Sequence, residues 1–150
     1  MVLPILKKTI PNLKVYIVGG SASNKIRKRI AKEKFIFLTG FVKNLNKYLR
    51  AANTYVYPSK IGSGMKTRTL EALGSGCKVV STSQGVIGLK TNKNFCQVSD
   101  DNYKFAEMIY NSIKLDFSMK DRISVSKQVE KEYSWDKTSL KILSLYKKIK

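Results

Sequence analysis

The 150-residue sequence contains no histidine, only two cysteines, and 10 acidic residues against 29 lysines and arginines. Without histidine, a Ser-His-Asp catalytic triad and a histidine-based metal site are both excluded. Cys77 and Cys96 show neither metal-binding nor redox spacing, so we expect two free thiols in a reducing cytosol. The sequence also lacks a signal-peptide pattern and any apolar run long enough to span a bilayer. We therefore expect a cytoplasmic protein with a single domain over residues 1–150.

The scarcity of acids leaves a net charge of +19. Such a charge favours anionic partners, which include nucleic acid, anionic lipid and phosphorylated small molecules. Lysine is nevertheless spread along the whole chain, as a compositional bias of the source genome would also produce. The basic segment 25–34 could follow RNA phosphates, but it lacks interleaved aromatic residues, and no RNA-binding motif is present. Nucleic acid is therefore not the expected partner.

Apolar segments typical of buried strands alternate with segments of helical periodicity. The expected strands cover residues 14–18, 35–38, 54–57, 78–82 and, more weakly, 95–98. The expected helices cover 21–34, 42–52 and most of the chain from 102 onward, while residues 1–8 fit the end of a helix. Ser134 is a suitable N-cap for a last helix, in which Trp135 is expected to be a core anchor.

Apolar strands without polar alternation indicate a parallel sheet that is covered on both faces. Right-handed crossovers then give an α/β fold with a Rossmann-like doubly wound parallel sheet, helices on both faces and further helices at the C-terminus. Ligands of such folds bind beyond the carboxyl ends of the strands. Glycines at 19–20, 40 and 62–64 all follow expected strands, so they gather at this edge.

The central stretch 57–82 reads as the end of a strand, a glycine loop, a short helix, a glycine stop and a second strand. Gly62 and Gly64 allow the backbone to approach a ligand closely. The unpaired N–H groups at the start of the following helix point back at this loop and suit a phosphate. Glu71 lies in that helix, and it has either a specific ligand or a helical ion pair with Arg68 or Lys66.

Two phosphate-binding motifs do not fit. Gly19 and Gly20 lack the third glycine of a dinucleotide fingerprint and the acid that should follow about twenty residues later, so a simple strand-ending turn is the alternative. The phrase that ends in Lys66-Thr67 has the wrong glycine spacing for a phosphate loop of the ATPase class. That class would also need a magnesium-binding acid near a strand end.

Taken together, the motifs resemble the C-terminal, donor-binding domain of the GT-B "group 1" (family 4-like) glycosyltransferases. The matching phrases follow the family's order over nearly the whole chain. They are Leu13 to Gly20, Phe37 to Val42, Tyr57-Pro58-Ser59, Gly62 to Lys66, Leu70-Glu71-Ala72, Gly76 to Thr82 and Tyr133-Ser134-Trp135. The resemblance implies one half of a GT-B fold and an enzyme that transfers a hexose from a nucleotide-diphosphate sugar, retaining and metal-independent, with no cofactor.

The resemblance also implies roles for individual residues. Glu71 would bind the ribose hydroxyls of the donor. Phe41 and Val42 would lie beside the nucleobase, and Gly19 belongs to the adjoining glycine turn. The diphosphate and sugar would be held by the loop and helix start, which comprise Gly62, Ser63, Gly64, Met65, Lys66 and Thr67. No catalytic residue and no metal ligand is assigned.

The sequence departs from the family pattern in two ways. Ser63 stands where the family usually has a glutamate, and a subgroup with Gly-x-Gly and a basic residue in this loop is more similar, so Lys66 would supply that contact. The family's first strand of this domain, with an arginine and a lysine for the diphosphate, is not matched, nor is the N-terminal acceptor-binding domain. An acceptor-binding domain or a partner chain would complete the enzyme, and peripheral contact with an anionic membrane is implied by analogy.

Two other classes of function remain open at the level of sequence. A basic binding or scaffold module could keep this fold and associate with anionic lipid or nucleic acid through its charge. The matching domain of a nucleotide-sugar epimerase would share the same architecture.

Overall fold

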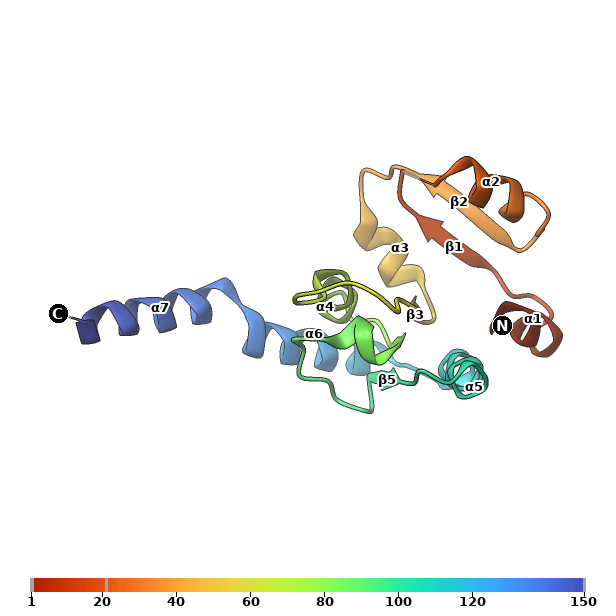
Figure 1. Ribbon diagram of the computed structural model, residues 1–150. Coiled ribbons are helices and arrows are strands. Elements are labelled where there is room, and N and C mark those ends of the chain that lie inside the picture. The colour runs from red at the N-terminus through yellow and green to blue at the C-terminus, as the bar shows by residue number, and fades with distance from the viewer. Residues whose placement is uncertain (1, 21, 150) are drawn as a thin grey trace.

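The computed structural model describes residues 2–20 and 22–149, which form an α/β domain with one long projecting helix (Figure 1). Met1 and Ser21, which belong to two of the expected helical segments, lie outside the described residues. The first half contains α1 (Val2–Thr9), β1 (Val15–Val18), α2 (Asn24–Ile30), β2 (Ile36–Gly40), α3 (Leu45–Ala51), β3 (Tyr55–Tyr57) and α4 (Thr67–Gly74). The second half contains β4 (Val79–Ser81), the 3-10 helix η1 (Ser83–Val86), β5 (Cys96–Val98), α5 (Asn102–Lys114), α6 (Met119–Tyr133) and α7 (Trp135–Ile149).

The centre of the domain is a parallel sheet with strand order β3-β4-β5. All three residues of β4 are buried, and successive side chains point to opposite faces of the sheet. Val79 packs into a core cluster with residues of α3, α4 and α6, and Val80 packs into a second cluster with residues of α1 and α5. The expected arrangement, an α/β fold with parallel strands and helices on both faces, is confirmed.

The two clusters are compact and apolar. The first contains Leu49, Ala72, Leu73, Cys77, Val79, Cys96 and Val125, and the second contains Leu6, Val80, Phe105, Ala106 and Ile109. Burial raises the pKa of Cys77 and of Cys96 to about 11, so both thiols stay protonated at neutral pH. Both cysteines are free, as expected.

The strands β1 and β2 depart from the expectation, because among the described residues they pair in parallel only with each other and lie apart from the β3–β5 sheet (Figure 1). Residues 14–18 and 35–38 were expected to be buried strands, but Tyr16 is 53% exposed, and Ile17 and Phe37 are also exposed. Tyr16 stacks on Phe37 with ring centroids 5.1 Å apart, which covers part of this surface. The prediction of burial was wrong here because a two-stranded sheet receives too little cover from its neighbours.

The end of α4 is determined by a left-handed glycine. Gly76 has φ of +76°, which L side chains rarely adopt. Its N–H donates to the carbonyl of Leu73 (2.9 Å), and the N–H of Cys77 donates to that of Ala72 (3.0 Å). This is the Schellman arrangement, and it turns the chain from α4 directly into β4.

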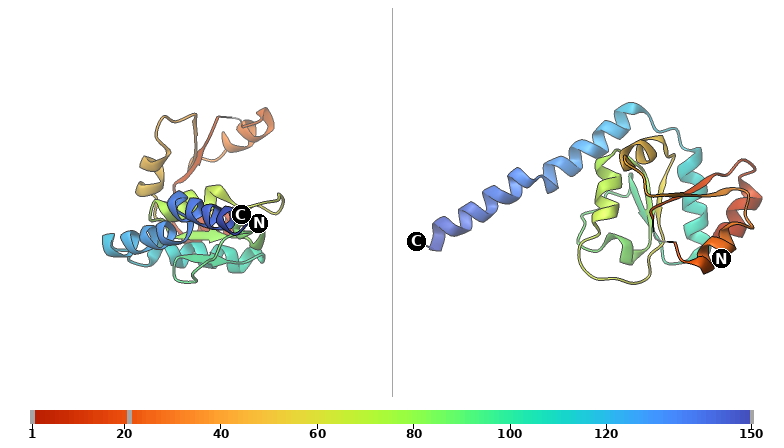
Figure 2. Two further views of the ribbon diagram at one scale, coloured as in Figure 1. Left: turned by 90° about the vertical axis from the view of Figure 1, so that its left-hand side faces the viewer. Right: turned by 90° about the horizontal axis from the view of Figure 1, so that it is seen from above.

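Of the last two helices, α6 belongs to the body of the domain and α7 projects from it. A capping box between Ser118 and Asp121 starts α6, which packs on α4. The expected N-cap of the last helix is confirmed, because the Ser134 hydroxyl accepts from the N–H of Lys137 (3.3 Å). The helix α7 then extends away from the body (Figure 2), and none of its described residues is buried. Trp135 is 87% exposed, so the prediction that it anchors a core was wrong.

Candidate functional site

The central loop joins the carboxyl end of β3 to the first turn of α4, at the edge where parallel α/β sheets bind ligands. Gly62 has φ of +113° and Gly64 has φ of +69°, so both take conformations that other residues resist. The Ser59 hydroxyl donates to the carbonyl of Ile61 (2.8 Å) and tightens the turn that precedes them. The loop therefore brings its backbone close to the start of the helix.

Residues 82–88, which follow β4, hold this loop from the other side. The Gln84 side-chain amide donates to the carbonyl of Gly62, and the Thr82 hydroxyl donates to the carbonyl of Ser59. The N–H of Lys66 donates to the carbonyl of Ile87 (3.3 Å). These bonds reach both ends of the loop, so residues 82–88 help to fix its shape together with its own glycines.

The turn η1 is packed tightly between α4 and the strand ends. The Thr69 hydroxyl, which is buried, donates to the carbonyl of Gly85 (2.7 Å). A Cβ atom on Gly85 would lie 2.1 Å from the Ser81 hydroxyl oxygen and 2.6 Å from a ring carbon of Tyr57. The backbone N–H of Ser83 donates to the carboxylate of Asp100 (3.0 Å), and the hydrogen bonds from Ser83 lower the pKa of that carboxyl.

The side chain of Lys66 lies against the glycine loop. Its side chain is largely covered, with only 7% of the residue exposed, and its ammonium donates to the carbonyl of Ser63 (3.1 Å). Lys66 is also the N-cap residue of α4, and among the described residues no side chain caps this helix and no acid lies in its first turn. The loop therefore faces a cation and the positive end of a helix dipole together.

Glu71 forms the ion pair that the sequence offered as one alternative. Its Oε2 lies 3.1 Å from a guanidinium nitrogen of Arg68, three residues earlier on α4. Both side chains are more than half exposed, so the pair contributes little to stability. About half of the Glu71 side chain (51%) is exposed to solvent.

The predicted site residues fall into two groups. Gly62, Ser63, Gly64, Met65, Lys66, Thr67 and Glu71 lie on the loop and α4, next to the β3–β5 sheet. Gly19, Phe41 and Val42 lie at the carboxyl ends of β1 and β2, where the N–H of Gly19 donates to the carbonyl of Gly40 (3.1 Å). Phe41 is 86% exposed. No hydrogen bond within the described part of the chain joins the two groups.

Three residues of this region were missed from sequence: Thr69, Gln84 and Gly85. Gln84 and Gly85 follow the strand expected at 78–82, and their contacts with the loop and α4 depend on how β3 and β4 align. The one available signal was Gly85, since an isolated glycine beside a strand often marks a close approach of backbone.

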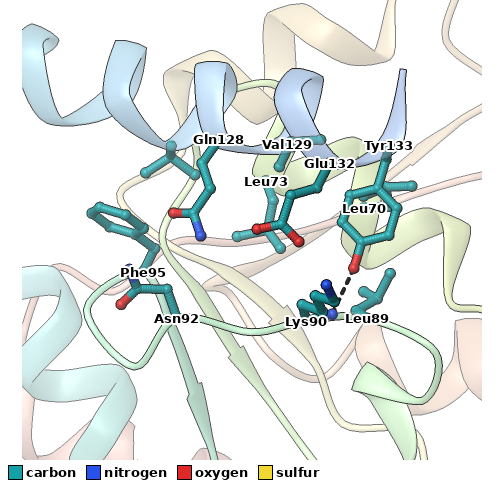
Figure 3. A pocket seen from close by; sticks show the side chains of 11 residues that line it. Leu70, Leu73, Leu89, Lys90, Asn92, Phe95, Gln128, Val129, Glu132 and Tyr133 are labelled. Atoms are coloured by element: carbon teal, nitrogen blue, oxygen red, sulfur yellow. Dashed lines mark hydrogen bonds between the residues drawn. The ribbon is translucent and has the colours of Figure 1, made fainter. Parts of the chain in front are cut away.

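A separate cavity of about 20 Å³ lies between α4, α6 and the segment after Leu89 (Figure 3). Tyr133 is one of the lining residues, and its hydroxyl accepts from the N–H of Lys90 (2.6 Å). A volume of this size holds about one water molecule. It cannot receive a nucleotide, so the glycine loop remains the candidate site.

No group of three or more cysteine or acidic side chains within residues 2–20 and 22–149 could hold a metal ion. The same residues contain no helix that is both long and apolar enough to cross a membrane.

Comparison with known proteins agrees with this architecture. A family model described as "Glycosyl transferases group 1" matches residues 1–114, and this is most of the chain. The chain therefore belongs to the group 1 glycosyltransferases, the family whose GT-B fold its motifs resemble. A search of curated protein sequences gave no match.

Several solved structures share the fold. TarM superposes with a TM-score of 0.74 at 22% sequence identity and covers 97% of this chain. A mutant of TarM from S. aureus, described in complex with fondaparinux, alpha-GlcNAc-glycerol and UDP, gives a TM-score of 0.78 at 23% identity and 97% coverage. The GtfA/B complex gives 0.66 at 18% identity, with 99% of this chain covered. The chain spans only 31% of each TarM chain and 32% of the GtfA/B chain.

Proposed function

We propose that this domain binds a nucleotide-diphosphate sugar and serves as the donor-binding part of a retaining, metal-independent glycosyltransferase that transfers a hexose. Membership of the group 1 family supports glycosyl transfer. The observation that carries the site assignment is the position of Lys66, whose ammonium lies beside the loop 62–64 at the N-terminus of α4.

The diphosphate suits this position for electrostatic reasons. An ammonium has three N–H donors, of which one is used by the carbonyl of Ser63. The others can bind phosphate oxygens, while backbone N–H groups of the loop and of the first turn of α4 complete the shell. Ser63, in the place of the usual family glutamate, adds no negative charge to oppose the ligand.

Glu71 is proposed to bind the ribose. A carboxylate accepts well from two vicinal hydroxyls, and charge-assisted hydrogen bonds are the stronger kind. The ion pair with Arg68 holds the side chain on the exposed surface of α4 through Oε2. Phe41 and Val42, with the turn at Gly19, are proposed to line the nucleobase from the β1–β2 side.

Transfer to an acceptor is proposed to need an acceptor-binding domain or a partner chain. The chain accounts for about a third of each similar structure, and one of these is itself a complex of two proteins, GtfA/B. Contact with an anionic membrane remains a prediction of the resemblance. The alternatives of a scaffold module and of an epimerase have no observation in their favour.

Calorimetric titration of the 150-residue chain with UDP, GDP and ADP, each with and without EDTA, tests the assignment. We expect one nucleotide to bind, with an affinity that EDTA leaves unchanged. Lys66→Met should weaken binding roughly tenfold because a charge-assisted contact to phosphate is lost. Glu71→Gln should weaken binding of the nucleoside diphosphate and have little effect on inorganic pyrophosphate. Lys47→Met, an equivalent change on α3, serves as the control.

The site assignment is wrong if none of the nucleotides binds, or if Lys66→Met and Glu71→Gln both bind like the parent chain. Binding that EDTA abolishes would contradict metal independence while leaving the location of the site intact.

A further inference from the structure

Asp100 lies at the same edge of the β3–β5 sheet as the glycine loop. The three strands are parallel, so their carboxyl ends share one edge, and each end leads into a different segment. The glycine loop follows β3, η1 follows β4, and Asp100 follows β5. This edge therefore carries an acid to which the proposed donor contacts assign no role.

Asp100 caps the start of η1 from a neighbouring strand. The Thr82 hydroxyl, at the N-cap position of η1, donates to the carbonyl of Ser59 and makes no capping bond. Instead, the Oδ1 of Asp100 accepts from the N–H of Ser83 (3.0 Å). An N–H at the start of a helical turn has no partner within the turn, so a carboxylate is a favourable acceptor for it. Hydrogen bonds from the side chain and the backbone of Ser83 lower the pKa of Asp100, which keeps this carboxylate ionised at neutral pH.

The neighbouring acid, Asp101, has a different and local role. Its Oδ1 accepts from the N–H groups of Tyr103 (3.1 Å) and Lys104 (2.9 Å), so Asp101 is the N-cap of α5. The two acids therefore have separate functions in the fold. Asp101 starts its own helix, whereas Asp100 reaches across to the segment that follows β4.

The segment that Asp100 caps is in contact with the glycine loop. Gln84, the residue after Ser83, donates its side-chain amide to the carbonyl of Gly62. Just beyond η1, the carbonyl of Ile87 accepts from the N–H of Lys66 (3.3 Å). A cap that fixes the start of η1 therefore also steadies the residues that hold the loop and the start of α4.

We propose that Asp100 is a positioning residue of the donor site, an inference that rests on the proposed function. Its hydrogen bond with Ser83 fixes η1, and η1 holds the glycine loop and Lys66 in the arrangement that binds the diphosphate. Asp100 does not contact the ligand in this role. Because like charges repel, its carboxylate by itself opposes a diphosphate nearby, so its benefit to binding comes through the hydrogen bond.

Two substitutions of Asp100 separate the hydrogen bond from the charge. Asp100→Asn keeps an oxygen that can accept from Ser83 and removes the charge, whereas Asp100→Ala removes both. In calorimetric titration with the nucleotide that the parent chain binds, we expect Asp100→Ala to weaken binding at least about threefold. Asp100→Asn should bind at least as tightly as the parent chain. Asp136→Ala, which removes an acid from the first turn of α7, serves as the control and should change nothing.

Amide exchange measured by NMR tests the same role without any nucleotide. The N–H of Lys66 bonds to Ile87 and makes no contact with Asp100, so it reports on the loop and not on local fraying at Ser83. We expect this amide to exchange at least about threefold faster in Asp100→Ala and at the parent rate in Asp100→Asn. Circular dichroism confirms that each variant is folded.

The two measurements distinguish failure of this inference from failure of the proposed function. If the parent chain binds no nucleotide, the proposed function fails, and exchange at Lys66 alone decides whether Asp100 orders the loop. The positioning role is overturned if Lys66 exchanges at the same rate in Asp100→Ala and the parent, or if a parent that binds nucleotide is matched by Asp100→Ala. It is also overturned if Asp100→Asn weakens binding as much as Asp100→Ala, because the charge would then matter and not the hydrogen bond.

Discussion

Gly85 lies against Ser81, Tyr57 and Thr69 of the candidate site. Replacing it with alanine, which adds one methyl group, tests how closely these residues are packed. An added Cβ would overlap the Ser81 hydroxyl and the Tyr57 ring, while the carbonyl of Gly85 accepts from Thr69. We expect Gly85→Ala to lower the free energy of unfolding by about 1–3 kcal/mol, the usual cost of overpacking. Urea denaturation gives this value directly.

Gly20→Ala is a matched control, because the nearest atoms to its added Cβ are 4.0 Å away. It should change the free energy of unfolding by less than about 0.5–1 kcal/mol. Since Gln84 lies next to Gly85 and donates to Gly62, Gly85→Ala should also weaken nucleotide binding. Equal stability of the two variants would contradict the close packing of η1.

Sequence and structure agree best where local chemistry decides the conformation. The glycine at 76 ends α4, and Ser134 caps α7, because a left-handed turn and an N-cap depend on one or two residues. The loop between β3 and α4 was likewise predicted from residue types and spacing, whereas the role of Glu71 stays a prediction. Gln84 could not be found in this way, since its bond to Gly62 depends on the alignment of two strands that are far apart in sequence.

The pair β1–β2 shows why strand burial cannot be inferred from composition alone. The apolar residues 15–18 predict a strand correctly, but their burial depends on which elements pack against them. The β3–β5 sheet has α4 and α6 on one face and α1 and α5 on the other, whereas Tyr16 and Phe37 cover mainly each other. The same reasoning applies to Trp135. Its size suggested a buried position, but no described element packs over it, and it is 87% exposed.

Backbone amides should exchange hydrogen at different rates in the β1–β2 pair and in the β3–β5 sheet. In β1, Val15 donates to the carbonyl of Phe35, so the alternate residues Tyr16 and Val18 direct their N–H groups away from β2. Within the described residues β1 pairs with no other strand. We expect the amides of Tyr16 and Val18 to exchange at least about a hundredfold faster than that of Val80 in β4.

Exchange measured by NMR at neutral pH gives this comparison in one sample, and Phe105 in α5 serves as a second buried reference. Protection of Tyr16 and Val18 equal to that of Val80 would show that the outer edge of β1 is covered in solution.

At the scale of the whole molecule, the body of the domain, which comprises α1 to α6 with the strands, buries apolar side chains, whereas the described part of α7 buries none. The body has two buried apolar clusters, while α7 contributes to neither of them. Its large apolar residues Leu140, Leu145, Tyr146 and Ile149 are exposed, and the helix extends away from the sheet and its covering helices (Figure 2). The stability of the domain should therefore be nearly independent of this helix.

Truncation after Ser134 removes α7, none of whose described residues is buried, so it should cost little free energy of unfolding. Since one kcal/mol corresponds to about 2–4 °C for a chain of this length, we expect the melting temperature to shift by less than about 3 °C. Truncation after Gln128 is the matched comparison, since it also removes Val129, which packs on the first cluster, and Tyr133, which bonds to Lys90. That loss of burial should lower the melting temperature several times more. Circular dichroism measures both, and a collapse of the fold on removal of α7 alone would show that this helix carries stability through contacts other than those described.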